Sequence, residues 1–313
     1  MSAITDVAGI RVGHAQDDEA RTGCTVVLGP FRAAADIRGS ATGTREIDAI
    51  SPFHLVERAD AILLTGGSAY GLAAADGVMQ WLEEQGGDFG YDTGVARVPI
   101  VPAAVIFDLA VGRADRRPDA AMGRAACEAA GREVREGRVG AGTGATVGMA
   151  LGPDRTMPGG VGTAAITGSG YTVGALAVVN ALGDVLSAQG RIIAGTLDPD
   201  GGFAGSAALA REGGSRTPLP PPGTATTLCV VATDAPLDRS ALRALARAGS
   251  TGQARRISPA HTPFDGDVTF AVSPSEPAEA APPGLKLALG ALASLAVGLA
   301  IERAVTAGGS GGG

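Results

Sequence analysis

The sequence predicts a tightly turned α/β fold in which strands and helices alternate and two sheets pack closely together. Of the 313 residues, 45% are hydrophobic and 49 are glycine, a composition typical of a globular protein that can bury a sizeable core. Between residues 61 and 85 a buried strand, a glycine turn and a helix follow in succession. Glycines also recur inside the strand candidates between residues 139 and 179, which indicates close approach of two backbones.

The first ninety residues contain three predicted strands and one helix. Apolar and β-branched runs predict the strands, a loop rich in glycine and hydroxyl residues precedes the third, and the helix follows a turn at residues 66–67. A glycine turn that opens a helix can bind phosphate, but GGSAYG lacks both the GxGxxG spacing and a P-loop lysine. Close helix packing or a pocket wall explains this turn better. The strands are expected at 10–14, 24–28 and 61–64, and the loop at 38–46.

The middle of the chain continues the alternation. Residues 98–109 predict a strand at a sheet edge or pocket wall, because Pro99 and Pro102 interrupt it. Residues 120–134 predict a helix dominated by alanine. The three glycine-punctuated strand candidates lie at 139–151, 161–167 and 171–179.

Two helices are predicted after residue 236. Residues 237–256 place apolar side chains inward and arginines outward, as in an amphipathic helix. Residues 285–301 are apolar enough to suggest a membrane span, but their alanine and glycine content and Lys286 favour a buried helix. The glycine-rich tail at 308–313 is expected to be disordered.

Charge and cysteine spacing indicate the kind of partner and the cell compartment. The net charge is -7 and no basic cluster is present, so nucleic acid is not an expected partner. Cys24, Cys127 and Cys229 lack CxxC spacing, which favours buried free thiols in a reducing compartment, and no signal peptide is visible, so we expect a cytoplasmic protein.

The stretch from residue 217 to 235 is the most informative in the chain. Prolines at 218 and 220–222 predict an extended linker, and the run from 226 to 232 predicts a buried strand. Thr226 is therefore the first residue of a core strand after an exposed segment. If the peptide bond before it were cut, its α-amine, with a pKa near ~8, could serve as base for its own hydroxyl. The alternative is a threonine chosen for β-propensity alone.

Three further side chains are candidates for the same chemistry. Asp265 and Asp267 flank a glycine, so both carboxylates could face one way and orient an ammonium group; two carboxylates alone make a poor cation site. Asn180 ends an apolar strand and could donate to an oxyanion, although a turn-forming role before Gly183 is the simpler interpretation. The three histidines are scattered, and no metal site or GxSxG elbow is predicted.

Long motifs spread over residues 4–304 resemble the DmpA-type peptidase family. This family contains the L-aminopeptidase/D-esterases, the β-peptidyl aminopeptidases and the endo-type 6-aminohexanoate-oligomer (nylon) hydrolases. The motifs occur in order along the chain as ITDVAGIRVGH, LLTGGSAYGLAAADGV, VPIVPAAVIFDL, VGAGTGATVG, YTVGALAVVNALGDV, TTLCVVATDAPL and HTPFDGDVTFA.

The resemblance implies a fold and a maturation step. The implied fold is a four-layer αββα sandwich of the DmpA and ornithine acetyltransferase type, similar to N-terminal-nucleophile hydrolases. One domain, residues 1–313, would cut itself between Ala225 and Thr226 into an α subunit of residues 1–225 and a β subunit of residues 226–313. The family usually forms a compact homo-oligomer such as a tetramer.

The resemblance also implies residue roles. Thr226 corresponds to the nucleophile, Asn180 to the oxyanion amide, and Asp265 and Asp267 to the aspartates that position the nucleophile. Neither a metal nor an organic cofactor is implied.

Three positions depart from the pattern expected for the family. Ala225 stands where asparagine or glycine is common, Met149 where the nylon hydrolases have a lysine, and Phe107 where a tyrosine is frequent. With Tyr70 from the glycine turn, Phe107 and Met149 are the expected substrate-pocket residues. Without a cation at position 149, the amine of Thr226 must itself act as base, assisted by the two aspartates.

The resulting hypothesis is a self-processing amide hydrolase that forms an acyl-enzyme on Thr226. Its substrate would be a small or oligomeric linear amide, such as a 6-aminohexanoate oligomer or a short peptide, and no membrane is involved. Three alternatives remain open: an aminopeptidase/D-esterase acting on small peptides and amino-acid amides, an amine acyltransferase, and an uncleaved relative without catalysis.

Overall fold

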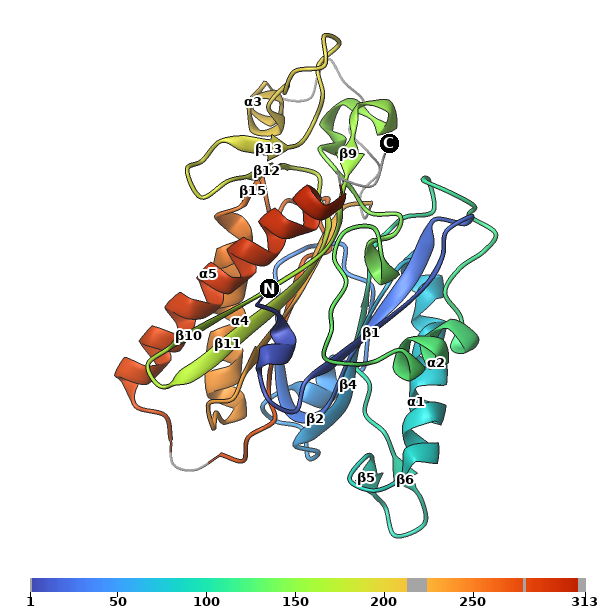
Figure 1. Ribbon diagram of the computed structural model, residues 1–313, viewed down its shortest axis with the longest axis vertical. Coiled ribbons are helices and arrows are strands. Elements are labelled where there is room, and N and C mark those ends of the chain that lie inside the picture. The colour runs from blue at the N-terminus through green and yellow to red at the C-terminus, as the bar shows by residue number, and fades with distance from the viewer. Residues whose placement is uncertain (1, 213–223, 278–279, 309–313) are drawn as a thin grey trace.

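The chain folds into four layers. The computed structural model describes residues 2–212, 224–277 and 280–308. Figure 1 shows a pair of helices, two layers of strands and a second pair of helices side by side, which confirms the predicted αββα sandwich. The predicted proline-rich linker at 218–222 lies outside the described residues, and so does the predicted tail from residue 309 onward.

Nine strands form one hydrogen-bonded sheet that supplies both strand layers. Its order is β10-β11-β14-β16-β2-β4-β7-β3, and β1 pairs with β2 beside this path. The β14/β16 and β4/β7 pairs are parallel, and the other pairs are antiparallel. The strands span β1 (Arg11–Asp17), β2 (Thr22–Ile37), β3 (Thr44–Arg45), β4 (Arg58–Thr65), β7 (Ala103–Val105), β10 (Gly160–Gly168), β11 (Tyr171–Asn180), β14 (Thr226–Thr233) and β16 (Val268–Ser273).

The long strand β2 takes part in both layers. Its residues 22–28 pair with β1, its residues 32–37 pair with β16, and its register with β4 shifts between Leu28 and Phe31. Because the strand changes partner at this shift, the sheet folds over and its two halves face each other. The central core lies between them and includes Phe31, Ile62, Leu176, Leu228 and Phe270, all fully buried.

Strand β14 runs through the middle of this arrangement. All of its residues are buried, which agrees with the predicted strand at 226–232. β-Branched and apolar side chains on both faces suit a strand that is covered on both sides. The first residue of β14 therefore lies at one end of the protein interior.

Helices cover both outer faces. Helices α4 (Arg239–Ala254) and α5 (Pro283–Gly308) pack together on the β10/β11 side, and α1 (Ala74–Gln85) and α2 (Ala120–Glu128) pack on the β1/β2 side (Figure 1). Helices α2 and α4 begin at aspartate caps: Asp119 accepts from the backbone N–H of Met122, and Asp238 from that of Ala241.

Helix α5 is a core helix, as predicted for residues 285–301. Its length and composition would allow it to cross a membrane, but it packs along β10 and β11. Its buried stripe consists of Leu289, Ala293, Ala296, Val297, Ala300, Ile301 and Ala304. The alanines of this stripe let the helix lie close to the glycines of β10.

The remaining elements are short. Two-residue or three-residue strands form three small sheets, β13-β12-β15, β5-β6 and β8-β9. These strands are β5 (Tyr91–Asp92), β6 (Arg97–Val98), β8 (Thr146–Val147), β9 (Met157–Pro158), β12 (Asp184–Leu186), β13 (Ile192–Ala194) and β15 (Ile257–Ser258). The short helices are α3 (Ser206–Arg211) and the 3-10 turns η1 (Ile4–Asp6), η2 (Asp48–Ile50), η3 (Ser68–Ala73), η4 (Gly140–Gly142), η5 (Met149–Leu151) and η6 (Pro153–Arg155).

Three predicted elements differ from the structure. In the 98–109 segment the longest strand is the three-residue β7, because Pro99 and Pro102 remove backbone donors. The 139–151 strand is wrong: the segment forms two 3-10 turns around the two-residue β8, since its glycines do not hold an extended ladder. The 120–134 helix ends at Glu128.

The backbone N–H groups of the glycine turn at 66–67 have hydrogen-bond partners within the protein. The N–H of Gly67 donates to the buried Asp108 carboxylate at 2.7 Å, and that of Ser68 donates to the Ile106 carbonyl at 3.0 Å. These donors are used within the protein, which agrees with the packing interpretation rather than with phosphate binding.

Candidate active site

Register brings the two principal candidate residues together. Asn180 is the last residue of β11, Thr226 is the first of β14, and the two face each other as paired residues of the antiparallel ladder. Asn180 is fully buried and Thr226 is 3% exposed. The hydroxyl and the amide that the sequence singled out thus lie at the same end of two adjacent strands.

The amide of Asn180 has a fixed orientation. Its oxygen accepts from the backbone N–H of Thr146 at 3.0 Å, so its nitrogen must face the other way. That nitrogen donates to the carbonyl oxygens of Thr224, at 3.1 Å, and Phe107, at 3.3 Å. The donor is therefore directed at the backbone that precedes Thr226, where the acyl side of a bound amide would lie.

The Ala225 carbonyl is held by two donors. The Thr226 hydroxyl donates to its oxygen at 2.6 Å, and the Gly266 N–H donates to the same oxygen at 2.8 Å. This pairing polarises the carbonyl and keeps the hydroxyl beside it. Sequence reasoning did not identify Gly266 as a donor, because a backbone N–H has no side-chain signature.

The two aspartates of the DGD turn have different surroundings. Asp267 accepts from the backbone N–H of Thr227 at 2.7 Å, and Asp265 accepts from that of Thr262 at 2.6 Å. Both are 3% exposed, and Asp265 pairs by its backbone with Ala225 in a parallel bridge. Burial, and then the negative charge of Asp267, raise the pKa of Asp265 to about 6. Near neutral pH this carboxyl can exchange a proton.

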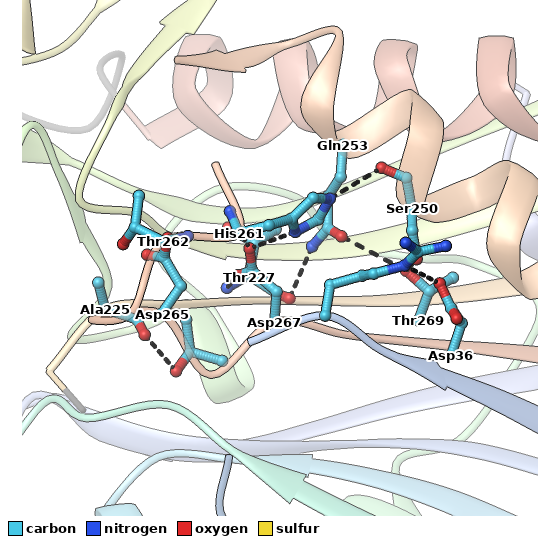
Figure 2. Close-up of polar contacts among 12 residues, drawn as sticks. Asp36, Ala225, Thr227, Ser250, Gln253, His261, Thr262, Asp265, Asp267 and Thr269 are labelled. Atoms are coloured by element: carbon cyan, nitrogen blue, oxygen red, sulfur yellow. Dashed lines mark hydrogen bonds and ion pairs between the residues drawn. The ribbon is translucent and has the colours of Figure 1, made fainter. Parts of the chain in front are cut away.

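A histidine completes the cluster. His261 Nδ1 lies 2.9 Å from Asp267 Oδ2, and its Nε2 lies 3.2 Å from the Ser250 carbonyl oxygen (Figure 2). The sequence analysis treated the three histidines as scattered and missed this residue. Its position four residues before Asp265, in the same turn motif, was the available signal.

The three expected pocket residues are placed differently. Met149 is 8% exposed and packs with Leu182, Phe264 and Ala225 in an apolar cluster beside the Ala225 carbonyl. Phe107 contributes its carbonyl oxygen, which accepts from Asn180.

Tyr70, the third expected pocket residue, is 62% exposed, and the Arg117 guanidinium lies 3.8 Å from the centroid of its ring. Within the described part of the chain, no hydrogen bond joins Tyr70 to Thr226, Asn180 or the two aspartates. Its role in a pocket stays a prediction.

Metal-binding groups are not clustered. Among residues 2–212, 224–277 and 280–308, no group of three or more histidine, cysteine, aspartate or glutamate side chains could hold a metal ion. All three cysteines are buried free thiols, and burial is the main cause that raises their pKa well above the ordinary value. They are poor nucleophiles in this state.

The fold defines the class of protein. Similar solved structures include a β-aminopeptidase of a Burkholderia species, with 24% identity and a TM-score of 0.73 over 98% of this chain and 86% of that one. An L-aminopeptidase D-Ala-esterase/amidase from Ochrobactrum anthropi, described as a new variant of the Ntn hydrolase fold, matches at 21% identity with the same TM-score and coverage. This chain has that fold.

The sequence comparisons give the family. The model of peptidase family S58 matches residues 2–308, so the chain belongs to peptidase family S58. An uncharacterized aminopeptidase of Mycobacterium tuberculosis is 48% identical over 98% of this chain and 93% of its own length. A 6-aminohexanoate-oligomer endohydrolase of a Kocuria species is 34% identical over 87% of this chain and 74% of its own. The protein is a hydrolase that acts on amide bonds.

Proposed function

We propose that this protein is a self-processing amide hydrolase whose nucleophile is Thr226 after cleavage of the Ala225–Thr226 bond. The observation that carries the proposal is the geometry at that bond. The Thr226 hydroxyl lies 2.6 Å from the Ala225 carbonyl oxygen, which also accepts from the Gly266 N–H at 2.8 Å. The proposed nucleophile and an oxyanion donor therefore both contact the Ala225 carbonyl group in the uncut chain.

Maturation would be an N-to-O acyl shift. The hydroxyl oxygen of Thr226 adds to the Ala225 carbonyl carbon, the carbon–nitrogen bond breaks, and the hydroxyl proton passes to the departing nitrogen. An ester now joins the two parts of the chain. Water then hydrolyses this ester, which leaves a carboxylate on Ala225 and a free α-amine on Thr226.

Turnover would use the same atoms on a second carbonyl. The free amine of Thr226 takes the hydroxyl proton while the hydroxyl oxygen attacks the substrate amide, and the Asn180 amide donates to the oxyanion. The substrate's amine leaves with the proton, and water releases the acyl group from Thr226. Asp265 and Asp267 would hold the amine in place and exchange its proton.

The surroundings of Ala225 support a linear aliphatic substrate. Ala225 stands on the acyl side of the bond to be cut, and it packs in an apolar cluster with Met149, Leu182 and Phe264. An acyl chain of methylene groups would find similar contacts there. We therefore favour linear amides such as 6-aminohexanoate oligomers or short peptides. An aminopeptidase/D-esterase is the second candidate, favoured by the name of the relative that is 48% identical.

One comparison tests activity and separates these candidates. Purified protein and the Thr226→Ala variant are given 6-aminohexanoate oligomers with free or acetylated N-termini, and new amine groups are counted. We expect the parent protein to cleave both forms and the variant to cleave neither. Cleavage of free oligomers alone would identify an aminopeptidase, and products joined to added amino acids would identify an acyltransferase. Hydrolysis by Thr226→Ala at the parent rate would contradict the proposal.

We also infer a homo-oligomer of the tetramer size that the family resemblance implies. Phe53, Leu55 and Val95 are 80–97% exposed in the single chain and are available for contacts between copies. Sedimentation velocity would show one species of four copies, and a monomer would contradict the inference.

A further inference from the structure

His261 has no assigned role, yet its surroundings are more constrained than those of an ordinary buried histidine. Its backbone has a positive φ of 57°, in the left-handed region that is uncommon for residues other than glycine, although asparagine, aspartate and histidine adopt it more often than most. This backbone turn lets one residue bind Asp267 twice. The backbone N–H donates to Asp267 Oδ2 at 3.2 Å and the ring Nδ1 lies 2.9 Å from the same oxygen.

Both ring nitrogens of His261 face oxygen atoms that can only accept. Nδ1 meets the carboxylate of Asp267, and Nε2 meets the backbone carbonyl of Ser250 on α4. A neutral imidazole has a single N–H and would leave one of these contacts without a proton. The imidazolium form satisfies both (Figure 2).

The position of Asp267 explains why its charge matters. Asp267 Oδ1 accepts from the backbone N–H of Thr227, the residue after the proposed nucleophile. With His261 on the other oxygen, Asp267 is a fixed carboxylate at the start of β14. Asp265 lies two residues away and is equally buried. Ionisation of Asp265 would place a second negative charge in the same site, which is unfavourable.

We propose that His261 is a positioning residue whose imidazolium pairs with the Asp267 carboxylate and thereby leaves Asp265 as the carboxyl group of the pair that exchanges a proton. This rests on the proposed function, because Asp265 and Asp267 can influence catalysis in this way only if the freed amine of Thr226 is the base. The cation of His261 offsets the charge of Asp267, so the amine of Thr226 gives up its proton at a lower pH than it would beside an uncompensated carboxylate.

The shift of the His261 pKa agrees with a charged imidazole at this position, although the same charge acts to lower the pKa of Asp265. Burial alone would lower the pKa of His261, but the hydrogen bond and charge of Asp267, together with the Ser250 carbonyl, raise it overall. The positive charge of Arg38 opposes this rise, although Arg38 is itself paired with Asp36. The other charged or titratable groups that face the cluster are Asp265 of the same turn, Cys229 of β14 and Arg247 of α4, which lies 3.9 Å from Asp36.

The test uses a substitution that removes the charge of His261 and retains a donor toward Asp267, while it gives up the contact of Nε2 with the Ser250 carbonyl. In His261→Asn the amide nitrogen can take the place of Nδ1, and asparagine tolerates the positive φ. The pH profile of kcat/KM is measured for the parent, His261→Asn and the control His54→Gln, whose ring is not part of this cluster. We expect the acidic limb of the His261→Asn profile to move to higher pH by about one unit, because a cation near the titrating groups is lost. The His54→Gln profile should match that of the parent.

A purely structural role would lower kcat/KM by the same factor at every pH, and that result would overturn the inference. If the parent protein cleaves amides and Thr226→Ala does not, an unmoved His261→Asn profile refutes the role of His261 alone. Nitrogen NMR of labelled histidines in the uncut Thr226→Ala protein gives a readout without catalysis. Two protonated ring nitrogens on His261 at neutral pH are expected, and a neutral tautomer there would also overturn the inference.

Discussion

In the proposed mechanism the side-chain amide of Asn180 donates to the oxyanion, and hydrogen bonds fix its orientation. Its oxygen is tied to the Thr146 N–H and its nitrogen faces backbone carbonyls on the acyl side of Thr226. We expect Asn180→Ala to lower kcat by about 100- to 1000-fold with little change in KM, the effect of removing one oxyanion donor. Steady-state kinetics on the cleaved fraction, quantified by mass, would measure this. A kcat within tenfold of the parent would show that another group binds the oxyanion.

Gly266 leaves room for the hydroxyl of Thr226, the proposed nucleophile. A Cβ at this position would lie 2.6 Å from the Thr226 hydroxyl and 2.9 Å from the Ala41 carbonyl oxygen. We expect Gly266→Ala to slow self-cleavage by roughly 100-fold, because a displacement of the hydroxyl by about 1 Å spoils the attack geometry. The cut fraction is followed on denaturing gels. Gly284→Ala is the control, since a Cβ there meets nothing within 4 Å, and equal cleavage of both variants would contradict the account.

At the scale of the element, the fit between α5 and β10 depends on glycine. A Cβ on Gly162 would clash with the Ala300 carbonyl and with the backbone of Ala304. We expect Gly162→Ala to reduce the free energy of unfolding by about 1–3 kcal/mol, as for overpacked cores. Urea unfolding of uncut Thr226→Ala protein measures the change. Gly131→Ala, where a Cβ would meet nothing within 4 Å, should stay within about 0.5 kcal/mol, and a similar loss in both would remove this explanation.

Elements with a strong periodic or β-branched pattern were predictable from the sequence. The strand from Thr226 and the helices after residues 236 and 282 appear where the patterns place them. The 139–151 segment was not predictable as two 3-10 turns, because its apolar and glycine residues suit a strand equally well. Its true shape depends on tertiary contacts such as that of Gly148 with the backbone of Gly195 and Thr196.

The candidate site was predictable to a different extent. Thr226, Asn180 and the two aspartates could be proposed from motifs, and the β11/β14 register that makes two of them neighbours follows only from the folded sheet. His261 was missed although it shares the turn motif with Asp265, because its contact with Asp267 depends on a left-handed backbone turn. The Gly266 N–H could not be proposed, because a backbone donor has no side-chain signature.

At the scale of the whole molecule, the buried carboxyl pair links stability to pH. The pKa of Asp265 is raised from its ordinary value of 3.8 to about 6, so between these values the folded state retains a proton that the unfolded chain has released. The contribution of Asp265 to stability is therefore highest below pH ~4 and falls as pH rises through about 6.

An uncharged substitute should remove this dependence. In the uncut Thr226→Ala protein, we expect Asp265→Asn to raise the free energy of unfolding at about pH 7.5 by on the order of 2 kcal/mol, and to have little effect near pH 4. Urea unfolding at the two pH values measures the difference. An equal effect at both would show that Asp265 does not titrate in this range.

The central claim is that Thr226 becomes an N-terminal nucleophile by cutting the chain before itself. Intact mass spectrometry of freshly purified protein, beside the Thr226→Ala variant, tests it most directly. The account predicts two polypeptides that meet between Ala225 and Thr226 in the parent protein, and one full-length chain in the variant. A parent protein that stays full-length and still hydrolyses amides would contradict the account, because catalysis would then proceed without a free Thr226 amine.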